Sequence, residues 1–163
     1  MTDIDKSVPL YVSLDVAPGY RNAVSLKLDD DPIDLRVQRT KSSPSPKWNT
    51  TFYLSYYTAS SDIHYYVNLS VDRKLQKMYG RTRLVDIEAE KELSTFTYQK
   101  LFDPSHEFSL RGELDGSTLS VYLDGELMDT EILPFEPTHV ELGASSGRFN
   151  VSVISPPPPP APE

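Results

Sequence analysis

Apolar and polar residues alternate with a period of two along most of the chain. Apolar residues occupy every second position in short runs such as 10–16, 24–28 and 33–37, and turn sequences rich in Gly, Pro and Asp separate the runs. This alternation is typical of strands that bury one face and expose the other. About ten or eleven such runs, without intervening helices of about 10–15 residues, predict an all-β, antiparallel β-sandwich with Greek-key connections.

Two segments carry their own local signals. Asp124-Gly125 lies between apolar positions and supplies the positive φ angles of a type I′ turn, so it predicts a hairpin. Residues 88–102 are mixed, because Glu, Ala, Lys and Leu favour helix whereas Thr95-Phe96-Thr97-Tyr98 favours strand. We expect one short helix in this segment.

The two ends differ in composition from the middle. Residues 1–7 are polar and acidic and are expected to be disordered, and residues 8–154 are expected to form the sandwich domain. Residues 155–163 contain five consecutive prolines, which cannot pair in a sheet and favour an extended polyproline II segment. This proline-rich tail is interpreted as a linker to further domains, or else as a ligand for domains that bind such segments.

Composition excludes several kinds of function. The chain has no cysteine, which excludes disulfides and thiolate metal sites, and its net charge of −8 argues against nucleic-acid binding. Neither a signal peptide nor an apolar run of about 20 residues is visible, so we expect a cytoplasmic protein that could attach peripherally to membranes. The sequons at Asn49, Asn68 and Asn150 are therefore interpreted as coincidence.

No sequence pattern points to catalysis or to a cofactor. His64, His106 and His139 are far apart in sequence, and nucleophile-elbow, zinc-protease and phosphate-loop motifs are absent. The carboxylates of residues 29–31 point in different directions at a turn, which favours a solvated loop. We therefore expect no cofactor, no bound metal and no enzymatic activity.

The first half of the chain resembles a C2 domain. Pro46, Trp48, Asn49 and Phe52 stand at matching places of that family's Asn-Pro-x-Trp-Asn-x-x-Phe pattern, with Ser45 in place of the usual Asn. The resemblance covers roughly residues 8–90. It implies about eight core strands followed by extra C-terminal strands, with Trp48 anchoring the core. It also implies docking onto phospholipid membranes or protein partners.

Many C2 domains bind calcium through carboxylates from two loops. Here residues 17–22 contain no carboxylate, and Asp72 is followed by Arg73, Lys74 and Lys77. The resemblance therefore implies a calcium-independent domain, because cations stand where further metal ligands would be expected.

Nine of the 16 basic residues lie in two acid-free stretches, 36–47 and 73–83. Basic groups near an anionic bilayer contribute about 1 kcal/mol each, and apolar side chains among them could insert. We expect a docking surface for an anionic membrane or a protein partner. Its predicted residues are Arg36, Arg39, Lys41, Lys47, Arg73, Lys74, Leu75, Lys77, Met78, Tyr79, Arg81 and Arg83. The alternative is that these loops balance the acidic C-terminal half within the molecule.

A second hypothesis comes from the C-terminal third. Residues 119–127 resemble the Tyr-Val-Asp-Gly-Glu hairpin of laminin-G and legume-lectin-like sandwiches. That resemblance implies a lectin-like or protein-interaction sandwich that recognises glycans or peptides. Aromatic side chains that could stack on sugars are Tyr11, Tyr53, Tyr57 and Tyr122. A structural jelly-roll subunit has the same strand-rich profile and remains a third hypothesis.

Overall fold

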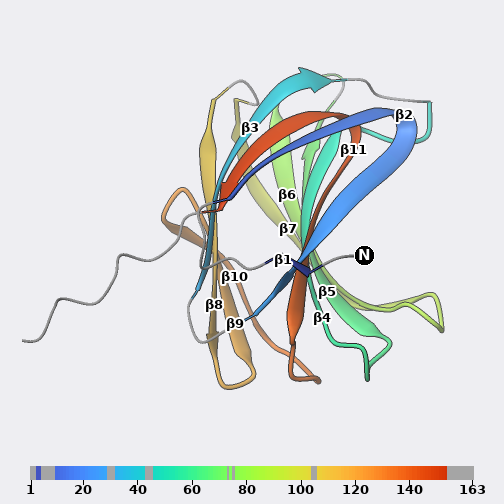
Figure 1. Cartoon of the computed structure of the whole chain (residues 1–163), viewed down its shortest axis with the longest axis vertical. Helices are drawn as coiled ribbons and strands as arrows, with labels where there is room; N and C mark the ends of the chain where they lie inside the picture. The colour runs from blue at the N-terminus through green and yellow to red at the C-terminus, as the bar shows by residue number, and fades with distance from the viewer. Residues whose placement is uncertain are drawn as a thin grey trace, which may run out of the picture.

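The computed structural model describes residues 3–4, 10–28, 32–42, 46–72, 74, 76–103 and 106–153, and these contain eleven β-strands (Figure 1). The strands are β1 (Asp3–Ile4), β2 (Leu10–Lys27), β3 (Ile33–Ser42), β4 (Thr51–Tyr57), β5 (Ile63–Val71), β6 (Met78–Asp86), β7 (Lys91–Phe102), β8 (Phe108–Asp115), β9 (Thr118–Leu123), β10 (Glu126–Ile132) and β11 (His139–Val153). Within these ranges we find no helix long and apolar enough to cross a membrane.

The strands form two sheets that share β2 and β11. The first sheet has the order β10-β9-β8-β3, followed by residues 147–153 of β11 and residues 10–16 of β2. The second sheet has the order β7-β6-β5-β4, followed by residues 139–145 of β11 and residues 21–27 of β2. All of these pairs are antiparallel, and the short β1 adds a parallel pair with β2.

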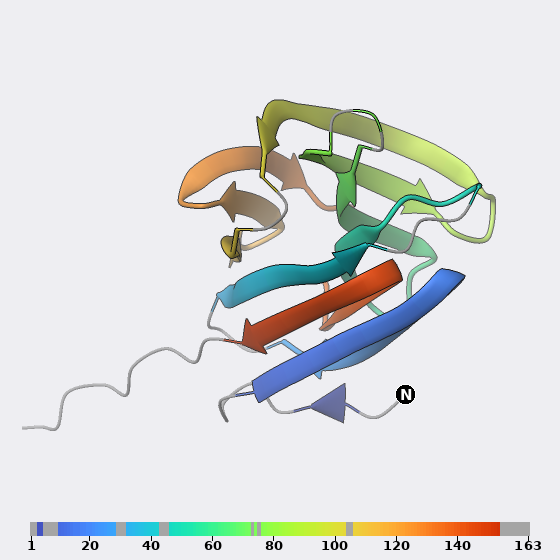
Figure 2. The same cartoon turned by 90° about the horizontal axis from the view of Figure 1, so that it is seen from above.

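Both shared strands bend where they pass from one sheet to the other, and β2 and β11 stay side by side through the bend (Figures 1 and 2). The bend of β11 lies at Ser146, which is fully buried and has a φ of 52°. Its Oγ accepts a hydrogen bond from the Gly19 N–H at 2.9 Å, and its carbonyl accepts one from Thr50 Oγ1 at 2.6 Å. These two bonds connect the bend to β2 and to the segment that precedes β4.

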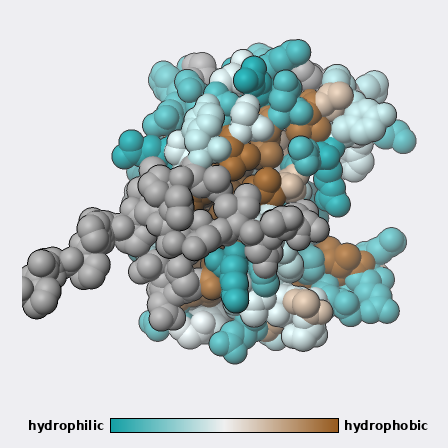
Figure 3. Space-filling view, in the orientation of Figure 1, coloured by the Kyte–Doolittle hydropathy of each residue, from teal (hydrophilic) through white to brown (hydrophobic). Residues whose placement is uncertain are grey.

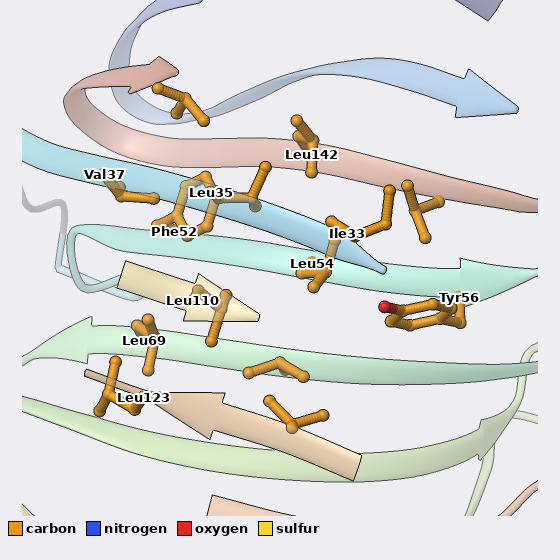
Figure 4. Close-up of a cluster of buried hydrophobic side chains, with 14 of the residues drawn as sticks. Ile33, Leu35, Val37, Phe52, Leu54, Tyr56, Leu69, Leu110, Leu123 and Leu142 are labelled. Atoms are coloured by element: carbon orange, nitrogen blue, oxygen red, sulfur yellow. The ribbon is translucent and has the colours of Figure 1, made fainter. Parts of the chain in front are cut away.

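The core lies between the two sheets and is built from the inward-facing residue of each alternating pair (Figure 4). Phe52, Leu54 and Leu69 come from the second sheet, and they meet Leu35 and Leu110 of the first; each is fully buried. Burying a side chain of this size contributes about 1.5–3 kcal/mol. The structure therefore confirms the predicted all-β antiparallel sandwich.

Local predictions had mixed outcomes. The Asp124-Gly125 hairpin is confirmed, because both residues have positive φ values, 50° and 79°, and connect β9 to β10. The short helix expected within residues 88–102 is wrong. Residues 87–90 form a turn, and β7 follows it and pairs with β6. Without β7, the N–H and C=O groups along one edge of β6 would have no strand to pair with. The hydrogen bonds that β7 makes to them outweigh the helix propensity of Glu and Lys.

Trp48 does not anchor the core, contrary to the expectation from the C2 resemblance. It lies between β3 and β4, and 59% of its surface is exposed. The aromatic centre of the core is formed instead by Phe52, which packs against Phe108 and Phe149 with ring centroids 6.5 and 5.7 Å away.

Replacing Thr50 by Val should destabilise the protein. The change keeps the side-chain shape but removes the hydroxyl that donates to the buried Ser146 carbonyl. Loss of a buried partner costs about 1–3 kcal/mol of unfolding free energy. Thr40→Val is the matched control, since Thr40 Oγ1 makes only a long, exposed bond to the Arg148 carbonyl, at 3.4 Å. Urea unfolding measures both variants, and equal effects would contradict the role assigned to Thr50.

Candidate functional site

An open groove of about 740 Å³ lies on the outer face of the second sheet. Its floor comes from β4, β5 and β6, and its end is formed by the bend of β2 together with the segment before β4. The lining residues are Gly19, Tyr20, Arg21, Lys47, Trp48, Asn49, Thr51, Tyr53, Tyr66, Asn68, Ser70, Tyr79, Arg81, Arg83 and Ser145. Aromatic, amide, hydroxyl and cationic groups thus line one surface.

Strand register arranges these side chains in rows that cross the sheet from β2 to β6. The first row contains Arg21, Ser145, Thr51, Ser70 and Tyr79. The second contains Ala23, Gly143, Tyr53, Asn68 and Arg81. The third contains Ser25, Glu141, Ser55, Tyr66 and Arg83. Because side chains alternate along a strand, the residues of β11, β4 and β5 that lie between these rows face the core.

The centre of the floor is the ring of Tyr53, which lies over Gly143. A Cβ at Gly143 would collide with this ring, so the absence of a side chain allows the ring to lie on the sheet. Tyr53 Oη donates a hydrogen bond to Glu141 at 2.7 Å. Burial, and then this hydrogen bond, raise the pKa of the Tyr53 hydroxyl. The Tyr66 ring meets it edge-on, with centroids 6.3 Å apart, so the two tyrosines form a fixed aromatic surface.

Two arginines of β6 stand beside this aromatic surface. The guanidinium of Arg83 lies 5.7 Å from the centroid of the Tyr66 ring, a favourable position for a cation. The carboxylate of Glu92 on β7 lies 3.1 Å from the guanidinium of Arg81 and 3.8 Å from that of Arg83, so it forms ion pairs with both. Arg81 also donates to Thr95 Oγ1 at 3.0 Å, which holds its side chain in the sheet face.

A stack of rings extends from the groove along the same face. His139, Tyr57, His64 and Tyr66 follow one another, with centroids 5.6, 5.4 and 6.0 Å apart. Burial in this stack lowers the pKa of His64, whereas nearby Glu141 and Asp62 act in the opposite direction. The neutral imidazole is therefore the form that the fold favours. In the described part of the chain, no three His, Asp or Glu residues gather closely enough to hold a metal ion.

The residues predicted for a docking surface do not form one surface. Lys47, Tyr79, Arg81 and Arg83 line the groove. Arg36 instead lies on the outer face of the first sheet, in a depression shared with Arg111 and Tyr122. The two outer faces point in opposite directions, because the inner faces pack against each other.

The other predicted docking residues lie elsewhere. Arg39 donates a hydrogen bond to Ser42 on β3, and Lys41 is exposed on the same strand. Lys74 and Lys77 are exposed between β5 and β6, whereas Met78 is fully buried and cannot reach a membrane. Arg73 and Leu75 lie outside the described residues.

Several groove residues were not predicted from the sequence as a site, among them Tyr20, Arg21, Trp48 and Tyr66. Tyr53 was considered for sugar stacking and does line the groove, but Tyr11 and Tyr122 lie on the first sheet. A usable signal was present in β5, where Tyr66 and Asn68 alternate with buried neighbours and so mark an outward face with groups suited to binding.

No family model matches the sequence, and no curated protein matches it either. The fold does match solved structures. A β-glucanase of Bacillus licheniformis superposes with a TM-score of 0.55 at 11% identity, over 89% of this chain and 75% of that chain. The carbohydrate-binding module CBM66 of Bacillus subtilis gives 0.53 at 14%, over 80% and 78%. The galectin LEC-6 of Caenorhabditis elegans gives 0.52 at 12%, over 90% and 95%.

These likenesses show the fold, a lectin-like jelly-roll sandwich, and they correct the family assignment. The C2 resemblance is wrong, and the phospholipid-docking role that rested on it falls with it. Of the motif's residues, Trp48 lies in an exposed segment, whereas Phe52 lies in the core strand β4. The comparisons also speak against the prediction that the chain has no enzymatic activity, because a β-glucanase and a transglycosylase share this fold; at 11% and 8% identity they show the fold alone.

Protonation of His64 should oppose folding. Its pKa is lowered in the folded state, so between that pKa and the ordinary value of about 6.5 the unfolded chain binds the extra proton. The free energy of unfolding should therefore increase with pH through this window and level off above it. Urea unfolding across the window should show a flatter profile for His64→Gln, with the exposed His106→Gln as control. An unchanged profile in His64→Gln would contradict the assignment.

Proposed function

We propose that the groove on the second sheet binds carbohydrate. The observation that carries this proposal is the composition of the lining, in which five aromatic residues stand among amide and hydroxyl groups. The aromatic residues are Tyr20, Trp48, Tyr53, Tyr66 and Tyr79. The polar ones are Asn49, Thr51, Asn68, Ser70 and Ser145.

Sugars combine C–H faces with rings of hydroxyl groups, and this lining suits both. Aromatic rings offer apolar area with little loss of conformational entropy, and a few placed polar groups fix the orientation of a ligand. Tyr20 and Trp48 are 71% and 59% exposed, so their rings are accessible at one end of the groove. Asn68 lies between Tyr53 and Arg81 in its row, where its amide can both donate and accept hydrogen bonds.

The comparisons support the proposal by the kinds of protein in which the fold occurs. A β-glucanase, a carbohydrate-binding module and a galectin share it, each at 14% identity or less. The groove supplies the independent argument, since it rests on residues of this chain alone.

Cleavage of the bound carbohydrate is a second candidate function, favoured by the enzymes among these structures. Glycoside hydrolysis commonly uses two carboxyl groups on either side of the scissile bond. Glu141 and Glu92 are both bonded to groove-lining side chains, Tyr53 and Arg81. Release of reducing ends from a bound oligosaccharide, abolished in Glu141→Gln or Glu92→Gln, would support this function; binding without release would remove it.

Binding to a glycan array should depend on the aromatic lining. Trp48→Ala and Tyr66→Ala should each weaken binding about tenfold, because each removes a ring on which a sugar can stack. Tyr11→Ala is the matched control, since Tyr11 is 63% exposed on the first sheet and outside the groove. The proposal fails if no glycan binds, or if the Tyr11 variant loses binding as strongly as the groove variants do.

A further inference from the structure

The groove is a cationic region on an acidic protein. The whole chain carries a net charge of −8, yet the fifteen lining residues include four cations and no carboxylate. The cations are Arg21, Lys47, Arg81 and Arg83. A concave surface with charges of one sign attracts ligands of the opposite sign.

Carboxylates beside the groove offset only part of this charge. Glu92 is the counter-charge of both Arg81 and Arg83, and Glu141, which accepts a hydrogen bond from the Tyr53 hydroxyl, adds one further negative charge against the four cations. Within the described ranges, Arg21 and Lys47 have no ion pair with any carboxylate. Arg21 and Lys47 are therefore available to pair with a ligand, whereas Arg81 and Arg83 share the single negative charge of Glu92.

The cations flank the aromatic floor on both sides. Arg21 lies on β2 and Arg81 on β6, with β11, β4 and β5 between them. Four strand spacings separate their backbones by about 19 Å, a width that a single sugar ring does not cover. A chain of sugars lying across Tyr53 and Tyr66 would thus bring acidic substituents within reach of cations at both edges.

We infer that the carbohydrate bound in this groove is an anionic oligosaccharide that carries carboxylate or sulfate groups, an inference that rests on the function proposed above. Arginine is suited to this task because its planar guanidinium can donate two parallel hydrogen bonds to a carboxylate or to another oxyanion. The tyrosines contact the sugar faces, and Arg21 and Lys47 pair with acidic groups. Arg81 and Arg83, which share the carboxylate of Glu92, add one net positive charge at the other edge.

The test compares probes that differ in charge alone. Calorimetric titration uses an oligogalacturonate and its carboxyl-reduced form, and in parallel a carrageenan oligosaccharide, which carries sulfates and no carboxylates, and its desulfated form. One of the acidic probes should bind at least about tenfold more tightly than its uncharged counterpart. Which pair shows the difference identifies carboxylate or sulfate. The affinity should fall as NaCl is added, because salt screens exposed charges.

Variants place the effect in the groove. Arg21→Gln and Lys47→Gln should each weaken binding of the acidic probe about tenfold and should weaken binding of its uncharged form by clearly less. Arg111→Gln is the control, because Arg111 is an exposed arginine on the first sheet that pairs with Glu113 at 2.7 Å.

The outcomes separate this inference from the function on which it rests. Binding of neutral glycans with equal or greater affinity would overturn the inference and leave carbohydrate binding intact. Failure of every glycan to bind would overturn both. Equal affinity for polyglutamate would also overturn the inference, since charge alone would then suffice without sugar rings.

Discussion

The structure depends on the bend that β2 and β11 make together as they leave one sheet and enter the other. Backbone pairing continues on both sides of the bend, and Ser146, Gly19 and Thr50 hold it through one partly buried and one buried hydrogen bond. The bend therefore also positions neighbouring residues in the groove lining. Tyr20 and Arg21 directly follow Gly19, and Asn49 directly precedes Thr50. The element that joins the two sheets is thus also the element that closes one end of the candidate site.

A second constraint is the strict division between inner and outer faces. In β4 and β5 the inward residues Phe52, Leu54, Val67 and Leu69 form part of the core, and the outward positions carry the polar and aromatic groups of the groove. Gly143 is an informative exception, because its missing side chain provides the space that the Tyr53 ring occupies. The aromatic floor is therefore fixed by the sheet itself and not by a loop.

Sequence alone predicted the parts of the fold that are decided locally. Alternation in runs such as 33–37 identified strands, and Asp124-Gly125 identified a hairpin, because both depend on near neighbours. Strand order could not be predicted in this way, since β3 pairs with β11 across more than a hundred residues and no turn encodes that choice. The error over Trp48 came from the C2 resemblance, which implied that Trp48 anchors the core, although the segment before β4 directs it outward.

The site shows the same limit. Arg81 and Arg83 were expected in a basic loop, and they lie instead on the strand β6, two residues apart, so that both line the groove. Arg36 was predicted for the docking surface and lies outside the groove, whereas Arg21 was not predicted and lines it, because the bend of β2 places it there. Trp48 has one further consequence. It is the chain's one tryptophan and lies in the groove lining, so a ligand that binds in the groove should change the intrinsic tryptophan fluorescence of the unlabelled protein.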